Sequence, residues 1–186
     1  MRGKILITAL LCLLAPLAAR ADVADSAANG FTVKITTEIH AAPADVYNKL
    51  VHHIGDWWNS DHTFSGDAHN LSIDEKPMGC FCEKLPNGGG VRHAEVIMYV
   101  PGKTLVMSGV FGPLQRLGAA GALSFAISPA GDGSKLEVTF AVGGYLAAGL
   151  NTWAAPVDNV LTEQVGRLKS YAETGNAGAA ADAKKH

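Results

Sequence analysis

The chain has 186 residues, of which 48% are hydrophobic, and a formal net charge of −2. This length suits one domain with a sizeable core, and the lack of a basic stripe in the sequence argues against nucleic acid binding, which needs clustered positive charge. After the first 21 residues, no apolar run approaches the length that a membrane span requires.

Residues 1–21 are typical of a cleaved secretory signal peptide. Two basic residues precede the apolar run Ile5–Leu14, which is too short to cross a bilayer, and Ala-Arg-Ala at 19–21 is a small-residue cleavage pattern. We expect cleavage after Ala21 and a periplasmic or secreted location. Cleavage removes three basic residues and no acidic one, so the 15 basic and 17 acidic residues become 12 and 17.

A short N-terminal linker, residues 22–29, is expected to lead into a strand and a helix. Residues 31–39 alternate apolar and polar side chains and are rich in β-branched residues, which indicates a half-buried strand. Residues 43–54 begin with proline and repeat an apolar residue every four positions, which indicates a helix that Gly55 ends.

The region from about residue 69 to residue 143 has the pattern of strands separated by turns. Residues 80–85 and 91–100 flank PNGGG, and residues 121–129 and 135–145 flank AGDG. Glycine-rich segments of this length between apolar runs predict two hairpins.

The last predicted element is a helix over about residues 153–172. Its apolar stripe includes Val157, Leu161, Val165 and Leu168, and Gly175 ends it. Residues 175–186 have low complexity and are expected to be a disordered tail. Antiparallel strands followed by one long helix predict an α+β fold, with the sheet curved to enclose the helix.

This order of elements resembles the helix-grip fold of the START-related superfamily, also called SRPBCC, the polyketide cyclase and lipid-transport group. The resemblance covers about residues 30–172 and is carried by TEIHAAPADVYNKL, GDWWNSDH, PGKTLVMSG and VDNVLTEQVGRLKSYAE. GPLQ and VGGY are similar to segments of exported bacterial members of uncharacterised function. The resemblance implies a START-like domain over residues 30–174, but no catalytic set, because the superfamily hosts many activities.

Two functions are compatible with the cavity that such a fold encloses between sheet and long helix. The first is a periplasmic binder or carrier of an apolar small molecule, lipid-like or polyketide-like. The alternative is an enzyme of the cyclase or dehydratase type with acid–base residues in the same cavity. We expect no cofactor, and the acidic mature chain favours neutral ligands. The sequence determines neither the ligand nor the oligomeric state.

The stretch GDWWNSDHTFSG, residues 55–66, is the first candidate for the rim of this cavity. Adjacent helical residues point about 100° apart, so Trp57 and Trp58 are not both expected to face the core. One should fill the core and the other should lie at the cavity mouth or on the surface. The alternative is a structural corner in which Asp61 caps a turn and the backbone satisfies His62.

The loop FGPLQRLGAAG, residues 111–121, is the second candidate for the rim, because apolar loop tips near a cavity act as lids. Large aromatic side chains offer rigid contact area, and a histidine can orient a polar group of the ligand. The residues expected to bind the ligand are Trp58, His62, Phe64, Phe111 and Leu114.

Glu83 and His93 are weaker candidates for catalysis. If the first hairpin pairs Leu85 with Val91, Glu83 lies opposite His93 on the same face of the sheet. Inside a cavity such a pair can transfer protons, whereas on the outer face it is an ordinary exposed pair. The sequence does not say which face they occupy, and the outer face is expected because glutamate is rarely buried.

The remaining histidines and the cysteines predict no metal site. The histidines between residues 52 and 93 lack metal-binding spacing, and Cys80 and Cys82 form a C-x-C that is not a zinc motif. We expect both cysteines to be unbridged and mostly buried, since a bridge between residues i and i+2 would be strained. A redox pair or a soft-metal site remains the alternative.

Overall fold

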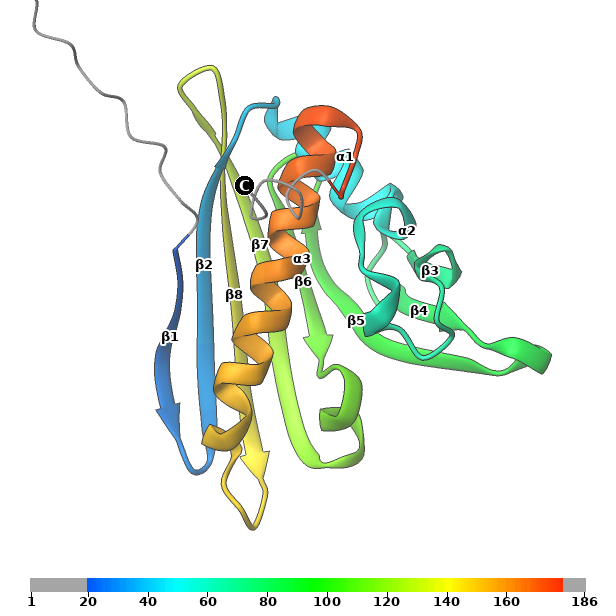
Figure 1. The fold of residues 1–186 in the computed structure, drawn as a ribbon, viewed down its shortest axis with the longest axis vertical. Helices are drawn as coiled ribbons and strands as arrows, with labels where there is room; N and C mark the ends of the chain where they lie inside the picture. Colours follow the sequence, from blue (N-terminus) through cyan, green and yellow to red (C-terminus); the bar gives the residue numbers. More distant parts are fainter. Residues whose placement is uncertain (1–19, 179–186) are drawn as a thin grey trace, which may run out of the picture.

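Eight antiparallel strands form one curved sheet around a long C-terminal helix in the computed structural model, which describes residues 20–178 (Figure 1). The spatial order of the strands is β1-β2-β8-β7-β6-β5-β4-β3. The strands are β1 (Arg20–Ala27), β2 (Gly30–Ile39), β3 (Leu71–Ile73), β4 (Cys80–Lys84), β5 (Gly90–Val100), β6 (Thr104–Gly109), β7 (Gly118–Ala130) and β8 (Gly133–Tyr145).

Within residues 20–178, three α-helices and several short 3-10 turns complete this α+β helix-grip fold, which confirms the expected fold class. The α-helices are α1 (Pro43–His52), α2 (Ile54–Trp57) and α3 (Ala154–Thr174). The 3-10 turns are η1 (Ser60–His62), η2 (Ala68–Asn70), η3 (Pro86–Gly88), η4 (Gly112–Arg116) and η5 (Leu150–Trp153).

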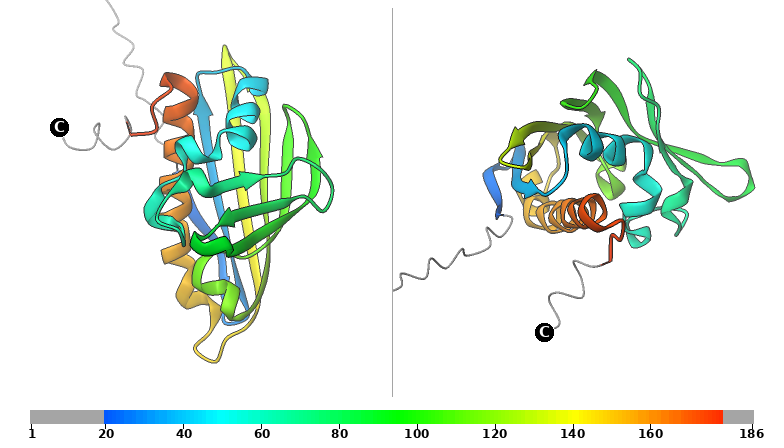
Figure 2. Two further views of the ribbon diagram at one scale, coloured as in Figure 1. Left: turned by 90° about the vertical axis from the view of Figure 1, so that its right-hand side faces the viewer. Right: turned by 90° about the horizontal axis from the view of Figure 1, so that it is seen from above.

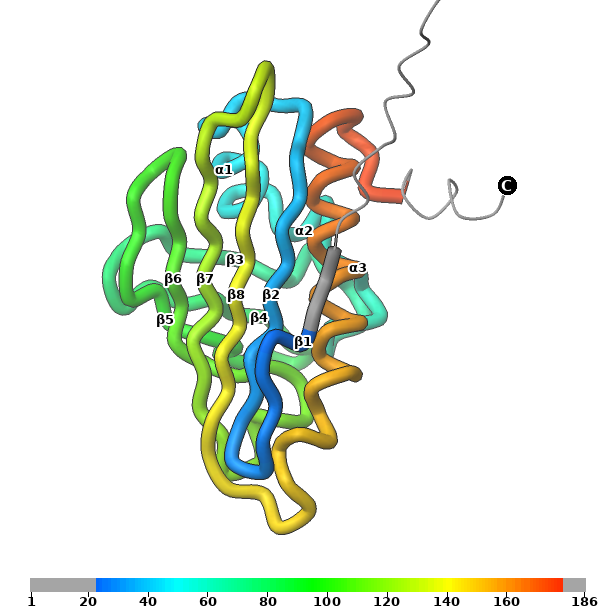
Figure 3. Tube along the Cα trace, turned by 90° about the vertical axis from the view of Figure 1, so that its left-hand side faces the viewer, coloured from blue at the N-terminus to red at the C-terminus, as the bar shows by residue number. Residues whose placement is uncertain are grey.

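The long helix α3 lies across the concave side of the sheet and packs mainly against β1 and β2 (Figure 2). Leu161, Val165 and Leu168 are buried on its inner face, as the apolar stripe predicts, while Val157 is only partly covered. From the opposite side, the long strands run next to one another and α3 lies behind β1 (Figure 3). Burial of one helical face and one sheet face produces a single core.

Local signals in the sequence account for several elements. In β2, side chains alternate between buried and accessible positions, which is the predicted pattern of a half-buried strand. The AGDG segment forms a tight hairpin in which Ala130 pairs with Gly133. Helix α3 ends at Gly175, whose left-handed φ of 75° suits glycine and whose N–H donates to the Tyr171 carbonyl.

Both ends of the domain differ from the sequence expectation. The expected linker contains most of β1, which pairs with β2 from Arg20 to Ala27, because an edge strand can form through backbone bonds without an apolar pattern. Most of the expected signal peptide lies outside the described residues, and a cut after Ala21 would shorten β1 by two residues. The tail begins with an ordered turn, in which the Ser170 hydroxyl donates to the Asn176 carbonyl, whereas residues 179–186 lie outside the described part.

Candidate functional site

A cavity of about 270 Å³ lies between α3, the segment around η1, the turn η4 and the inner face of the sheet. Its wall is predominantly aromatic and aliphatic, and its volume is near the lower end of the range for small-molecule pockets. The structure brings together all five residues expected to bind the ligand, namely Trp58, His62, Phe64, Phe111 and Leu114. It adds others that the sequence analysis missed, mainly Leu71, Phe81, Phe140, Trp153, Val157 and Val160.

Trp57 lies in the core and Trp58 at the cavity, as expected of one and the other, but both are buried, with exposed fractions of 2% and 8%. Helix α2 ends at Trp57, and Trp58 has an extended backbone with ψ of 140°, so the helical offset of 100° does not apply to the pair. Their rings meet edge to face with centroids 5.5 Å apart. Trp57 fills the core, whereas Trp58 lines the cavity and its indole N–H donates to the His62 carbonyl.

His62 joins the rim of the cavity to α3. Its Nε2 lies 3.1 Å from Oε2 of Glu163, and an ionised carboxylate only accepts, so the imidazole donates this bond. The structural-corner alternative is correct only in part, because Asn59 rather than Asp61 caps η1 through a bond from the Asp61 amide. His62 therefore closes the rim instead of presenting a free donor to the cavity.

The expected lid is folded more tightly than the sequence suggests. Phe111 is partly buried, and Leu114 in η4 is only 1% exposed, although we expected an exposed loop tip. The 3-10 turn directs Leu114 inward, and β7 begins at Gly118, so the second half of the expected loop is strand. Phe64 is the accessible part of the rim, with 47% of its surface exposed.

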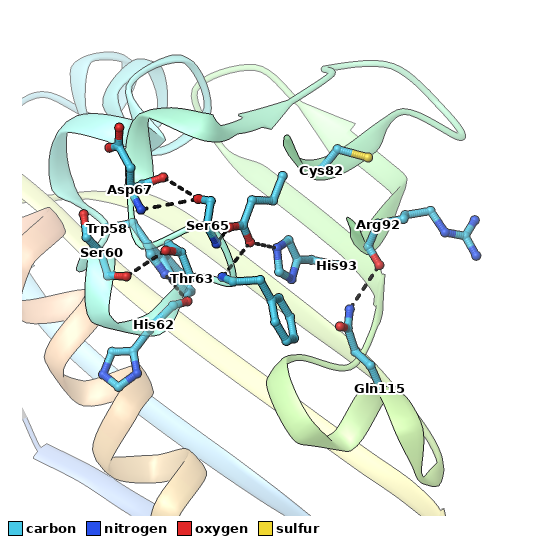
Figure 4. A network of polar contacts seen from close by, with 12 residues as sticks. Trp58, Ser60, His62, Thr63, Ser65, Asp67, Cys82, Arg92, His93 and Gln115 are labelled. Atoms are coloured by element: carbon cyan, nitrogen blue, oxygen red, sulfur yellow. Dashed lines mark hydrogen bonds and ion pairs between the residues drawn. The ribbon is translucent and has the colours of Figure 1, made fainter. Parts of the chain in front are cut away.

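Glu83 and His93 lie on the inner face of the sheet, and the expectation of an outer position is wrong. Their exposed fractions are 1% and 7%, and Oε2 of Glu83 is 2.9 Å from Nε2 of His93 (Figure 4). The expected register is also wrong, because Glu83 pairs with Val91 across the two strands. A bulge brings the side chains together: Phe81 pairs with Ala94 but Cys82 pairs with Arg92, so His93 is the extra residue. Such bulges redirect side chains, and this one directs the side chain of His93 toward the protein interior.

Burial of Glu83 is tolerated because its carboxylate accepts hydrogen bonds from three donors. The amide of Phe64 lies 3.1 Å from Oε2, the amide of Ser65 lies 2.5 Å from Oε1, and His93 supplies the third bond. The Ser65 hydroxyl in turn donates to the Asp67 carbonyl and fixes the turn that presents both amides (Figure 4). A buried anion is stable only with such partners, and the FSG segment gives no sequence signal for them.

The two pKa values favour an ionised glutamate beside a neutral histidine. Burial by itself would raise the pKa of Glu83, but the hydrogen bonds from Ser65, Phe64 and His93 hold it below the usual range. Burial lowers the pKa of His93 despite the adjacent carboxylate. Because the carboxylate only accepts, the Nε2–H of His93 donates to it, and Nδ1 keeps a lone pair. Within residues 20–178, Nδ1 has no hydrogen-bond partner.

Aromatic rings surround the imidazole of His93. The ring centroids of Phe81, Phe64 and Phe111 lie 5.1, 6.0 and 6.3 Å from its own, and the last two rings are nearly parallel to it. His93 is therefore a buried polar group in a predominantly apolar wall. This arrangement can orient a ligand that donates a hydrogen bond to Nδ1.

A second, more open hollow of about 480 Å³ lies next to the cavity, and Phe64 and His93 line both. Its other walls include the polar residues Ser108, Gln115 and Arg116. The Gln115 side-chain amide donates to the Arg92 carbonyl at 3.0 Å and connects η4 to β5 (Figure 4). The imidazole thus lies between an apolar cavity and a polar, open hollow.

Cys80 and Cys82 are joined by a disulfide, so the prediction of two unbridged cysteines is wrong. Alternate residues of a strand share one side, and the Cα atoms are 5.3 Å apart, within the usual range for a disulfide. The strain that we expected for a bridge between residues i and i+2 is therefore not required at this Cα distance. Both cysteines are partly accessible rather than mostly buried.

Across residues 20–178, no three His, Cys, Asp or Glu side chains are grouped in a way that would hold a metal ion. No helix in that range has the length and apolar character to span a membrane.

Comparisons with known proteins support the fold. No family model matches the chain, and no curated protein matches it. Among solved structures, the Aha1 dimer from Colwellia psychrerythraea is 18% identical with a TM-score of 0.56, over 77% of this chain and 97% of that one. CalU16 from Micromonospora echinospora is 14% identical with a TM-score of 0.51, over 89% and 95%.

DynU16, from the dynemicin biosynthetic locus, is 15% identical with a TM-score of 0.55. The match covers 78% of this chain but 48% of DynU16. Identities this low show a shared fold alone. The expected helix-grip architecture is therefore supported by both topology and structural similarity.

The Glu83–His93 pair predicts a pH-dependent stability. His93 has an ordinary pKa of 6.5 that the fold lowers, so below pH 6.5 the unfolded chain binds more protons than the folded one. The free energy of unfolding should therefore fall as the pH decreases below 6.5. Glu83, with an ordinary value of 4.5, should add a further loss at lower pH. Denaturant titrations at a series of pH values from 8 to 4 measure the free energy of unfolding.

The control variants separate His93 from other groups. His93→Asn keeps an N–H donor near Glu83 but does not titrate, so the fall in stability between pH 6.5 and pH 5 should become shallower. His40→Asn replaces a side chain that is 75% exposed and should leave the fall in stability between pH 6.5 and pH 5 unchanged. An equal slope in His93→Asn and wild type would contradict a buried neutral His93.

Proposed function

We propose that the protein binds a neutral, largely apolar small molecule, lipid-like or polyketide-like, in the cavity between the sheet and α3. The observation that supports this most strongly is the predominantly aromatic and aliphatic cavity with the buried imidazole of His93 in its wall. The ligand would place its apolar body against Phe81, Phe111 and Phe140. A hydroxyl or N–H group of the ligand would donate to Nδ1 of His93.

The charges near the cavity support a neutral ligand. Glu83 is buried directly behind His93, and no Lys or Arg among residues 20–178 lies within hydrogen-bonding distance of its carboxylate. An anionic group beside His93 would therefore be repelled, while a neutral donor would gain from the polarised imidazole. The similarity in fold to DynU16, from a biosynthetic locus, is compatible with a ligand of the polyketide type.

The neutral fluorescent probe N-phenyl-1-naphthylamine tests this proposal, since it combines an apolar aromatic body with one N–H donor. We expect stoichiometric binding to the folded protein. Phe111→Ala and Phe64→Ala should each weaken binding by about fivefold, because each removes roughly 1 kcal/mol of apolar contact. Fluorescence titration measures the affinity, and thermal unfolding verifies the fold of each variant.

Tyr145→Ala is the matched control, because this aromatic side chain is 76% exposed and does not line the cavity. It should bind the probe like wild type. No binding to wild type, or equal binding by all variants, would refute a ligand site in the cavity.

Acid–base catalysis on the bound molecule is the second candidate, and the Glu83–His93 bond favours it. A carboxylate that orients a neutral imidazole is the arrangement of a general base, with Nδ1 as the group that takes the proton. For a cyclase or dehydratase, incubation with poly-β-ketone or β-hydroxy ketone compounds should release one water molecule from the substrate, seen by mass spectrometry. His93→Asn should bind the compound but not convert it. Unchanged conversion by this variant would eliminate His93 as the base.

Export completes the proposal. The apolar run and the Ala-Arg-Ala pattern support cleavage after Ala21 and function in the periplasm or outside the cell. Expression of the full chain in a Gram-negative host should yield a periplasmic protein that begins at Asp22. A protein that retains Met1 in that fraction would contradict cleavage.

A further inference from the structure

The disulfide between Cys80 and Cys82 lies on the outer face of the sheet, away from the cavity. Phe81 between them is buried and lines the cavity, and neighbouring residues of a strand point to opposite faces. Both cysteines are partly accessible. A thiol from solution can therefore approach this bridge without entering the core, which distinguishes it from a disulfide buried in a core.

The residues that pair with the two cysteines differ in charge. Across the β4–β5 ladder, Cys82 pairs with Arg92 and Cys80 pairs with Glu95. In Figure 4, the side chains of Cys82 and Arg92 are both directed away from His93. The guanidinium of Arg92 bonds to Glu95 at 3.0 Å, and its side chain is 67% exposed. A nearby cation stabilises a thiolate, so Cys82 should form a thiolate more readily than Cys80.

The strand also keeps the two cysteines close when they are reduced. β4 is paired with β3 on one side and with β5 on the other, and only one residue separates the cysteines. The Cα distance of 5.3 Å is therefore fixed mainly by the sheet. This arrangement makes closure of the bridge an intramolecular step with little loss of chain entropy.

We propose that Cys80–Cys82 is a reversible dithiol–disulfide site that reacts with external thiols. A thiolate attacks Sγ of Cys80, a new S–S bond forms, and the Cys80–Cys82 bond breaks with Cys82 leaving as the thiolate. A second external thiolate then attacks the mixed disulfide and releases Cys80. Two protons bind the two cysteine thiolates, the protein gains two electrons, and the external thiols are oxidised to one disulfide. Arg92 promotes the first step because its positive charge lowers the pKa of Cys82, the leaving group, and a thiol of lower pKa leaves faster. This activity does not depend on the cavity ligand.

The first experiment is redox equilibration of the whole protein in mixtures of reduced and oxidised glutathione, followed by alkylation and mass spectrometry. We expect the protein to convert reversibly between no free thiol and two. Two free thiols in oxidised glutathione alone, or a bridge that reduced glutathione cannot open in the native protein, would overturn the proposal.

The second experiment tests the role of Arg92 in the rate of reduction by glutathione. Arg92→Gln should slow reduction by about threefold to tenfold, while Arg92→Lys should retain most of the rate. Lys135→Gln, on β8 and paired with Glu137 at 3.2 Å, is the matched control and should react like wild type. Equal rates in Arg92→Gln and wild type would contradict the assigned leaving group.

Single-cysteine variants provide an independent readout. In Cys80→Ser the remaining Cys82 should be alkylated by iodoacetamide at lower pH than Cys80 is in Cys82→Ser. This order of thiol pKa values follows from the positions of Arg92 and Glu95. The reverse order would contradict the charge asymmetry on which the proposal depends.

Discussion

The buried carboxylate of Glu83 is the constraint on which the candidate site depends. A charged group in a protein interior is stable only when its hydrogen bonds are supplied, and here three donors come from two separate segments. The amides of Phe64 and Ser65 come from the segment after η1, and His93 comes from β5. Glu83 therefore connects the rim of the cavity to its wall. Loss of its charge would weaken both attachments, because all three hydrogen bonds are made to this one carboxylate.

The β-bulge makes this arrangement possible. Without it, strict alternation would direct Arg92 and Ala94 to one face and His93 to the other, so His93 and Ala94 could not both face the core. Gly109 on β6 permits close approach at the same place, since a Cβ atom there would be 2.5 Å from the His93 carbonyl. The same irregular stretch of β4 carries Phe81 on the inner face and the two cysteines on the outer face. One local distortion thus shapes the cavity wall and places the disulfide opposite Arg92.

Regular elements could be predicted from the sequence because their signals are local. The alternation in β2, the AGDG hairpin and the apolar stripe of α3 each depend on residues close in the chain, and each is confirmed. The cavity-lining positions of Phe64 and Phe111 also followed from apolar residues in turn-rich segments. The resemblance to the helix-grip fold supplied the rest of the architecture.

The errors concern features that tertiary contacts decide. The rule that glutamate avoids burial failed at Glu83 because its donors come from residues about twenty positions earlier. The hairpin register was wrong because a bulge has no reliable sequence pattern. The burial of Trp58 together with Trp57 was not expected, because the end of α2 could not be located to one residue. The disulfide was missed because a bridge between residues i and i+2 was expected to be strained, whereas the Cα atoms of Cys80 and Cys82 lie 5.3 Å apart, within the usual range.

The central claim is that Glu83 holds His93 as a neutral imidazole whose Nδ1 lone pair remains available to the cavity. Long-range ¹H–¹⁵N correlation spectra of the histidine side chains test it most directly, with His93 assigned by comparison with His93→Asn. At pH 7 we predict a neutral ring for His93, with the proton on Nε2 and none on Nδ1. An imidazolium, or a neutral ring protonated on Nδ1, would contradict the account.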